Sequence, residues 1–190
     1  MEFIGGMIEP TGWRPPAELP EIAFSGRSNV GKSSLLNTLL RRRAFARVSK
    51  TPGRTREINF FKINGAFTLV DLPGYGYAKV SKERKEVWGG LIDDYLRNSP
   101  MLRGVVQLLD IRRDPSDDDM QMLDFLADLE KPTVVTLTKA DKLSKREVAE
   151  RSVQIARKLL LDPEQVIVFS SHSGLGRDEL AEAVSSLMTQ

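Results

Sequence analysis

The chain has 190 residues and a net charge of +2, with 41% hydrophobic and 28% charged residues and no cysteine. This size suits one domain with a buried core, and the lack of cysteine excludes disulfide frameworks, thiolate catalysis and zinc sites with cysteine ligands. No stretch approaches the roughly 18 apolar residues of a membrane span, and the N-terminal residues do not resemble a signal peptide. We therefore expect a soluble, cytoplasmic protein, monomeric and without a membrane partner.

The charges are unevenly distributed along the sequence. Between Arg41 and Arg56 there are seven basic residues and no acidic ones, whereas between Asp114 and Glu130 there are seven acidic residues and no basic ones. Such separation favours one face that attracts polyanions and another that repels them. Two ordinary solvated faces explain the pattern equally well, so charge alone does not decide.

Residues 1–20 are expected to form an extended lead-in, and residues 21–190 a single domain in which apolar stretches alternate with helical patterns. Strands are expected at 22–25, 105–109, 133–137 and 166–169, and a hairpin at 58–63 and 67–70 around Asn64 and Gly65. Helices are expected at 33–40, near Leu91, after Ser116 and Ser144, where the sequence indicates capping boxes, and at 176–188. This order predicts a three-layer α/β fold with a mostly parallel six-stranded sheet and one antiparallel hairpin.

Residues 26–33, GRSNVGKS, match the phosphate-binding pattern G-x-x-x-x-G-K-[ST] and lie between an expected strand and an expected helix. The glycines allow several backbone N–H groups to turn towards one phosphate, and the helix N-terminus adds its dipole. Lys32 supplies a charge for the β- and γ-phosphates, and the Ser33 hydroxyl supplies a ligand for Mg²⁺. The pattern predicts a mononucleotide site; a glycine turn with a surface lysine is the alternative.

Asp71 follows the strand at 67–70, and Gly74 comes three residues later, which is the D-x-x-G arrangement of nucleotide switches. The carboxylate suits the Mg²⁺ shell and the Gly74 N–H suits the γ-phosphate, although alone the pattern is more typical of a tight turn. The polar, basic residues 49–56 predict a mobile loop that supplies a second hydroxyl to Mg²⁺. Spacing leaves Thr51 and Thr55 as candidates.

Residues 138–141, TKAD, follow the strand at 133–137. Guanine presents its N1–H and N2 amine as adjacent donors for one carboxylate, so Asp141 is expected to select guanine while the stem of Lys139 lies along the ring. A structural Lys–Asp turn is the alternative. Thr138 departs from the usual asparagine of this GTPase pattern: its hydroxyl still ties strand to loop but cannot bond as an amide does. Residues 169–171 stand where a loop offering an N–H to guanine O6 is expected.

With GRSNVGKSS, KTPGRTREINFF, DLPGYGYAKV, TKADKL and SSHSGLG in this order, the chain from Glu21 onwards closely resembles the EngB family of bacterial GTPases, which belongs to the translation-factor-related class. The resemblance implies a Ras-like G domain, GTP and GDP as ligands, Mg²⁺ and a cytoplasmic setting. It also implies a role in assembly of the large ribosomal subunit, with ribosomal RNA or protein as partner, and a link to cell division and septation. It places the switch-loop ligand of Mg²⁺ at Thr55.

The expected site combines the motifs with this resemblance. Lys32, Asn29, Thr55 and Gly74 are expected to act in catalysis, and Ser33 and Thr55 to bind the metal. The residues expected to bind the nucleotide are Gly26, Arg27, Ser28, Asn29, Val30, Gly31, Lys32, Ser33, Gly53, Arg54, Thr55, Arg56, Glu57, Asp71, Leu72, Pro73, Gly74, Thr138, Lys139, Ala140, Asp141, Phe169, Ser170 and Ser171.

Catalysis has a gap in this sequence. Many small GTPases place glutamine directly after the D-x-x-G glycine to orient the attacking water, whereas this chain has Tyr75. A phenol cannot align water as an amide does, so weak intrinsic hydrolysis is expected. Related GTPases with asparagine at the position of Asn29 use it to hold K⁺ near the β- and γ-phosphates, where K⁺ does the work of an arginine finger. Simple bracing of the loop is an equal alternative.

The expected mechanism is a switch. GTP and Mg²⁺ order residues 49–56 and 73–85, and the ordered state presents residues 41–56 and 79–85 to ribosomal RNA until hydrolysis releases them. A P-loop ATPase or kinase, which has no use for Asp141, is the first rival. A non-hydrolysing scaffold stabilised by nucleotide is the second.

Overall fold

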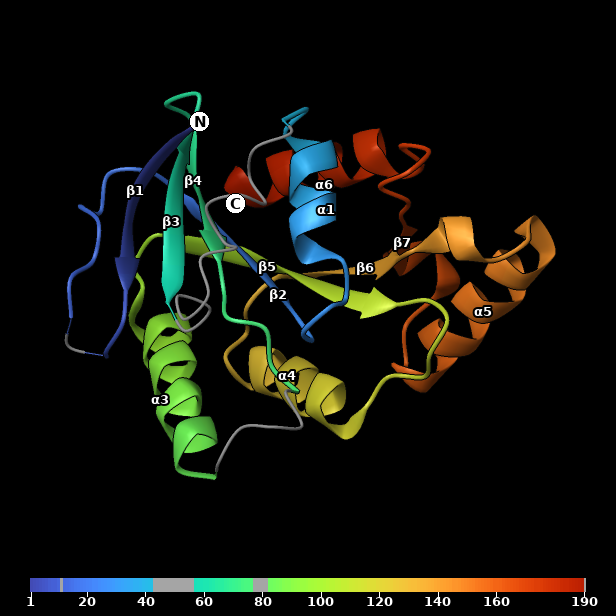
Figure 1. Cartoon of the computed structure of the whole chain (residues 1–190), viewed down its shortest axis with the longest axis horizontal. Coiled ribbons are helices and arrows are strands. Elements are labelled where there is room, and N and C mark those ends of the chain that lie inside the picture. Colours follow the sequence, from blue (N-terminus) through green and yellow to red (C-terminus); the bar gives the residue numbers. More distant parts are fainter. Residues whose placement is uncertain (11, 43–56, 77–81, 190) are drawn as a thin grey trace.

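The computed structural model describes residues 1–10, 12–42, 57–76 and 82–189. Its centre is a seven-stranded sheet in the order β1-β3-β4-β2-β5-β6-β7 (Figure 1). The strands are β1 (Glu2–Met7), β2 (Glu21–Gly26), β3 (Ile58–Ile63), β4 (Phe67–Asp71), β5 (Leu102–Asp110), β6 (Thr133–Thr138) and β7 (Val166–Val168).

Most of the sheet is parallel, as predicted. β2 pairs with β4 on one side and β5 on the other, and β6 and β7 continue in the same direction. The predicted hairpin is confirmed too, since β3 and β4 pair antiparallel. Its turn uses Asn64 and Gly65 with φ values of 50° and 70°, the left-handed pair that matches the twist of a two-residue hairpin. The parallel strands therefore all end at one edge of the sheet.

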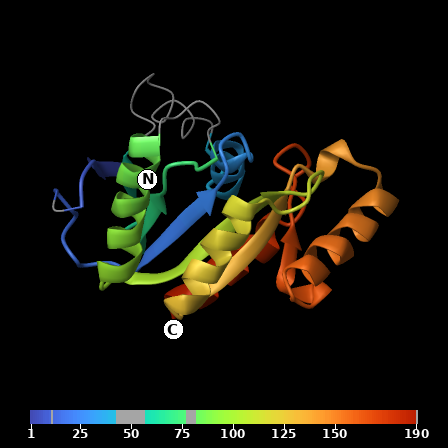
Figure 2. The same cartoon turned by 90° about the horizontal axis from the view of Figure 1, so that it is seen from below.

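Helices cover both faces of the sheet, which confirms the three layers (Figures 1 and 2). On one face lie α1 (Lys32–Leu39) and α6 (Arg177–Met188), and on the other α3 (Lys82–Asn98), α4 (Asp117–Asp128) and α5 (Lys145–Lys158). Two short 3-10 helices, η1 (Ala140–Lys142) and η2 (Pro163–Gln165), complete the described elements. Successive residues of β2 point to opposite faces: Phe24 packs with α1 and α6, and Ala23 with α3.

The prediction of six strands is wrong, because the N-terminal lead-in contains β1. This strand pairs antiparallel with β3. Gly5 and Gly6 lower its strand propensity, which is why the sequence did not indicate it. The indole of Trp13 lies so close that a Cβ on Gly5 would come within 2.5 Å of it, and the same indole meets the Phe60 ring edge-on at 6.2 Å. Packing against the rest of the domain thus forms a strand that local propensity does not favour.

Both predicted capping boxes are present. At the start of α4 the Ser116 side chain accepts from the Asp119 N–H, and the Asp119 carboxylate accepts from the Ser116 N–H at 2.8 Å. Ser144 and Glu147 make the same exchange at the start of α5. Each box satisfies two N–H groups that the helix leaves unpaired. The first box also fixes Asp119, which lies beside the functional site.

Candidate functional site

Most of the predicted site residues that the structure describes lie in loops or at the adjoining ends of strands and helices, at the edge of the sheet where parallel topology brings strand ends together. The loop at 26–33 leaves β2, Asp71 ends β4, Thr138 ends β6 and Phe169 follows β7. The structure therefore gathers the described parts of motifs that are far apart in the sequence.

The phosphate-binding loop turns where its glycines allow it. Gly31 has a φ of 108°, a conformation that side chains rarely adopt, and it directly precedes α1. Lys32 begins α1, and its side chain is 12% exposed. Its Nζ lies 2.8 Å from Oδ1 of Asp71 and also donates to the carbonyl of Leu72. The loop lysine and the D-x-x-G motif are therefore in direct contact.

Gly74 lies against the same loop. A Cβ at this position would stand 3.2 Å from both the Cα and the backbone N of Ser28, so a larger residue would have to displace backbone. Beside it, the Ser28 N–H donates to the carbonyl of Tyr75 at 2.9 Å. The backbones of Arg27 and Tyr75 form an isolated parallel β-bridge. The D-x-x-G turn is thus seated directly on the phosphate-binding loop.

Part of the predicted site lies outside the described residues: Gly53, Arg54, Thr55 and Arg56, the alternative ligand Thr51, and residues 77–81 of the segment 73–85 that GTP is expected to order. Glu57 is described and lies beside β1, where a Cβ on Gly6 would be 2.5 Å from its Oε2. Of the basic stretch, Arg41 and Arg42 are described, and both are exposed just after α1.

The T-K-A-D loop is bonded to the phosphate-binding loop. Thr138 is buried, and its hydroxyl lies 2.6 Å from the Val30 carbonyl and 3.0 Å from the Leu109 carbonyl. The predicted tie between strand and loop is confirmed, with one hydroxyl proton shared between two acceptors. Lys139 has a left-handed backbone, with φ of 65°, and its Nζ donates to the Asn29 carbonyl at 2.6 Å.

Asp141 is held by the last loop of the site. The Ser170 hydroxyl donates to its Oδ1 at 2.9 Å, and the Lys142 Nζ lies 3.0 Å from its Oδ2. Burial alone would raise the pKa of Asp141, but the bonds from Lys142 and Ser170 outweigh it and hold the pKa below its ordinary value. The Ala140 N–H donates to the Phe169 carbonyl at 3.1 Å, which joins the two loops. The carboxylate is therefore ionised and oriented.

The remaining predicted residues that the structure describes lie in or next to the same loops. Gly26 ends β2, Ser33 lies in the first turn of α1, and Pro73 stands between Leu72 and Gly74 in the D-x-x-G turn. The carbonyl of Ser171 accepts from the Thr38 hydroxyl of α1 at 3.3 Å.

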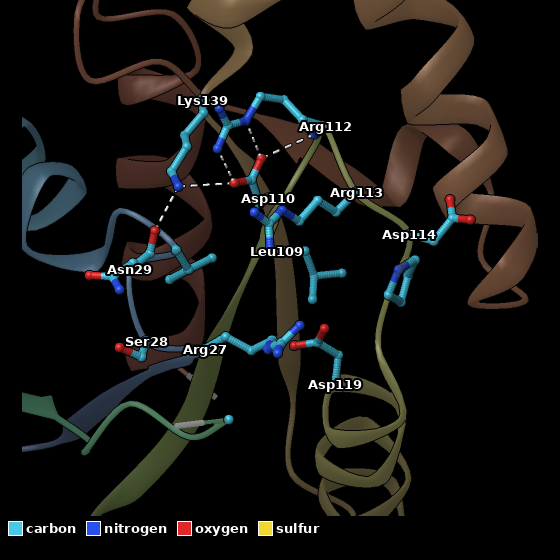
Figure 3. A pocket seen from close by; sticks show the side chains of 13 residues that line it. Arg27, Ser28, Asn29, Leu109, Asp110, Arg112, Arg113, Asp114, Asp119 and Lys139 are labelled. Carbon is cyan, nitrogen blue, oxygen red and sulfur yellow. Dashed lines mark hydrogen bonds and ion pairs between the residues drawn. The ribbon is translucent and has the colours of Figure 1, made fainter. Parts of the chain in front are cut away.

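A cavity of about 520 Å³ lies between the phosphate-binding loop, the loop after β5 and the start of α4 (Figure 3). Its lining includes a residue that the sequence analysis missed, Asp110, which accepts from Arg112 and Lys139. Burial would raise the pKa of Asp110, but the hydrogen bonds from Arg112 and Lys139 outweigh it and lower the pKa to about 2. One signal could have found it: a carboxylate at the end of a buried parallel strand stands where ligands bind.

Tyr75 points its hydroxyl into the junction between β5 and α4. The phenol donates to Oδ1 of Asp119 at 2.7 Å and accepts from the Gln107 amide. Burial and the nearby Asp119 carboxylate raise the pKa of Tyr75 far above its ordinary value. The hydroxyl is thus engaged with side chains of the domain and stays protonated.

The described oxygen atoms fit a hard divalent cation bound together with phosphates. The Asp71 side chain is 10% exposed, and its Oδ1 forms no hydrogen bond with good geometry among the described residues, although the Lys32 Nζ lies 2.8 Å away. Such an oxygen is available to a cation or to its bound water. Mg²⁺ usually takes one or two protein ligands and completes its shell with phosphate and water. Ser33 and Asp71 match that donor set.

The chain is similar to known GTP-binding proteins along its whole length. Residues 21–139 match the family described as 50S ribosome-binding GTPase. The chain is 59% identical over 188 residues to the "Probable GTP-binding protein EngB" of Gemmatimonas aurantiaca, which covers 99% of this chain and 92% of that protein. The protein of the same name from Trichlorobacter lovleyi is 48% identical over 191 residues, covering 99% and 95%. Among the described residues, no helix is long and apolar enough to cross a membrane.

Solved structures agree with this relationship. A crystal structure described as "a probable GTP-binding protein engB" matches with a TM-score of 0.74 and 25% identity, covering 89% of this chain and 98% of that one. A single-residue variant of Era from Aquifex aeolicus, bound to GDP and AlF₄⁻, matches in fold with a TM-score of 0.67 and 24% identity, covering 90% and 57%. In this chain the phosphate-binding loop is bonded directly to the T-K-A-D loop. Together with the similarity over the whole chain, this arrangement shows that the protein belongs to the EngB family of GTP-binding P-loop GTPases.

Proposed function

We propose that this chain is a GTP-hydrolysing switch that assists assembly of the large ribosomal subunit, as a cytoplasmic monomer. The observation that carries the guanine part is Asp141, an ionised carboxylate oriented by Ser170 in a loop that Lys139 joins to the phosphate-binding loop. The ribosomal part is supported by the family description, 50S ribosome-binding GTPase. A link to division and septation rests on the family resemblance alone.

The two ends of GTP are recognised by different chemistry. Backbone N–H groups of residues 26–33 and the Lys32 ammonium bind the phosphates, and the Gly74 N–H reaches the γ-phosphate. Asp141 accepts the N1–H and N2 amine of guanine, while a backbone N–H of residues 169–171 donates to O6. Adenine lacks the paired donors, so ATP would leave a carboxylate unpaired, which a site of this kind rejects strongly.

The metal ligands in this proposal are Ser33 and Thr55, with Asp71 in the surrounding shell. When bound there, Mg²⁺ would supply positive charge that offsets the negative charge of the phosphates. Asn29 is proposed to hold K⁺. Its carbonyl is fixed by Lys139 at 2.6 Å, whereas its side-chain amide makes no hydrogen bond to any residue that the structure describes. With respect to the described residues the amide is therefore available to a cation, which supports this role over bracing of the loop.

Intrinsic hydrolysis is proposed to be slow, because the Tyr75 hydroxyl is engaged by Asp119 and Gln107 and no glutamine follows Gly74. Turnover of GTP measured in KCl and in NaCl tests the role of K⁺. Faster turnover in KCl, lost in Asn29→Ala, is the expected result. Equal rates in the two salts, or full activity in Asn29→Ala, contradict it.

Guanine recognition is tested by competition against labelled GTP. ATP should compete about 10⁴-fold more weakly than GTP, because the site is built to pair both guanine donors. In Asp141→Asn the amide donates where the carboxylate accepted, so GTP should bind weakly and a xanthine nucleotide, with a carbonyl at C2, should bind better. Equal competition by ATP would indicate a P-loop ATPase instead.

The ribosomal partner is tested by recovering large-subunit precursors from cell extracts with the parent chain and with Lys32→Ala. Particles should be retained with a non-hydrolysable GTP analogue and released with GDP. Because contacts of residues 41–56 with RNA phosphates release counterions, retention should fall steeply with salt. Equal retention with GTP analogue, GDP or no nucleotide contradicts the switch.

A further inference from the structure

Asp110 lies between the two halves of the nucleotide site. It ends β5, the strand that separates β2 from β6, so it stands between the phosphate-binding loop and the T-K-A-D loop. Figure 3 shows its carboxylate between Lys139 and Arg112. Its Oδ2 lies 2.9 Å from the Lys139 Nζ, and Arg112 approaches through Nε at 2.9 Å and Nη2 at 2.7 Å. The Asp110 side chain is 11% exposed, so a mostly buried carboxylate pairs with both cationic side chains.

Lys139 is the residue on which this carboxylate acts. Its ammonium has three donors, and two of them bond to the Asn29 carbonyl at 2.6 Å and to Asp110 at 2.9 Å. Its stem passes Gly31, where a Cβ would lie 3.6 Å from the lysine Cε. Lys139 and Asn29 both have left-handed backbones, with φ of 65° and 63°. Non-glycine residues in this conformation persist where the surroundings hold them, and this ammonium connects the two.

We propose that Asp110 is a positioning residue for the guanine nucleotide: it holds Lys139 so that the lysine stem lies flat for the base while the ammonium fixes Asn29. Arg112 balances the charge of the carboxylate from the other side. Without Asp110, the four-carbon stem of Lys139 samples many rotamers, and binding of the nucleotide has to order it. Affinity for GTP and GDP falls equally, because both share the base and the loop. This inference rests on the proposed place of Lys139 at the guanine.

Asp110→Asn is the first test. The amide keeps an acceptor for the Arg112 N–H, now 3.1 Å away, so the turn after β5 is retained while the charge is lost. Dissociation constants for labelled GTP and GDP should both rise about tenfold, as expected for one hydrogen bond between charged groups. KM should rise in proportion with kcat unchanged, which is the mark of lost uniform binding. Arg113→Ala is the matched control, since the Arg113 side chain is exposed and makes no hydrogen bond or ion pair with the described residues, while its backbone N–H, which donates to the Asp110 carbonyl at 2.9 Å, is kept in alanine.

A double-mutant cycle separates positioning from a general structural effect. In a Lys139→Met background, Asp110→Asn should cost no further affinity, because no ammonium remains to be positioned. Unchanged affinity in Asp110→Asn, or the same loss in both backgrounds, would overturn the inference. Thermal unfolding without nucleotide checks folding, and Asp110→Glu, which keeps the charge on a longer arm, replaces Asp110→Asn in the cycle if the latter does not fold. ATP competing equally with GTP at the parent chain would overturn the proposed function instead.

Discussion

Two buried threonines of β6 offer a matched test of how the T-K-A-D loop is tied to the phosphate-binding loop. Thr138 and Thr136 are 2% and 0% exposed, and because they are two residues apart they point to the same face of the sheet. The Thr138 hydroxyl bonds to the Val30 carbonyl at 2.6 Å, whereas the Thr136 hydroxyl has no hydrogen-bond partner among the described residues. Valine replaces a hydroxyl by a methyl group of similar shape, so Thr→Val should act in opposite directions at the two positions.

The magnitudes follow from what each hydroxyl does. Thr138→Val removes a buried hydrogen bond and leaves the Val30 carbonyl against a methyl group, which costs about 1–3 kcal/mol of unfolding free energy. Thr136→Val removes a hydroxyl that was desolvated without compensation, which should stabilise the fold by about 1 kcal/mol. The two variants should therefore differ by about 2–4 kcal/mol, which for a domain of this size corresponds to roughly 4–16 °C in Tm.

Urea unfolding of both variants and the parent measures these differences, and nucleotide titration shows whether they reach the site. Thr138→Val should weaken the binding of GTP and of GDP to the same extent, whereas Thr136→Val should change the binding of neither. Thr138→Asn, the usual GTPase residue, brings two donors for two carbonyls and should bind nucleotide at least as well as the parent. If both Thr→Val changes shifted stability by the same amount and in the same direction, the Thr138 hydroxyl would not be the tie that its geometry indicates.

Three further predictions follow from individual contacts. The folded pKa of Asp110, about 2, lies below its ordinary 3.8. Its contribution to stability is therefore complete above about pH 5 and lost as the pH falls towards 2, so acid unfolding curves of the parent and Asp110→Asn should converge at low pH. In Gly74→Ala the added methyl group would stand 3.2 Å from the Ser28 backbone, so the Gly74 turn should shift slightly away from the phosphate-binding loop; single-turnover assays should show hydrolysis reduced by about tenfold, with GDP affinity retained. Tyr75→Phe should lower stability by about 1 kcal/mol through loss of its bond to Asp119 and leave kcat unchanged; a large loss of kcat would place the hydroxyl in catalysis.

Much of the fold could be predicted because its signals are local. Strands buried on both faces of a parallel sheet are short apolar stretches, and the hairpin turn needs the Asn64–Gly65 pair whatever surrounds it. β1 could not be predicted, because its two glycines weaken it and the packing of Trp13 on Gly5 depends on the folded domain. The prediction of six strands therefore missed β1, a strand that depends on tertiary contacts.

The site divides in the same way. Motif spacing predicted Lys32, Asp71 and Asp141, because the chemistry expected of them depends on residue type and on neighbours along the chain. Spacing could not predict Asp110, since its proposed role depends on a strand order that places β5 between β2 and β6. Nor could it show that the hydroxyl of Tyr75 turns into the domain. Residues that act across the sheet become visible only once the strands are ordered.

The bond from Thr138 has a consequence for the phosphates that follows from peptide geometry alone. A peptide unit is planar and trans, so fixing the direction of a carbonyl fixes the N–H of the next residue in the opposite direction. The Thr138 hydroxyl holds the Val30 carbonyl, and thereby orients the Gly31 N–H, which belongs to the loop proposed to bind phosphate. The loop proposed to select the base thus also orients a donor of the proposed phosphate site. Thr138→Val should consequently weaken the binding of inorganic pyrophosphate, which has no base, as well as the binding of GTP. If only nucleotides bound more weakly, the effect of Thr138 would lie at the base alone.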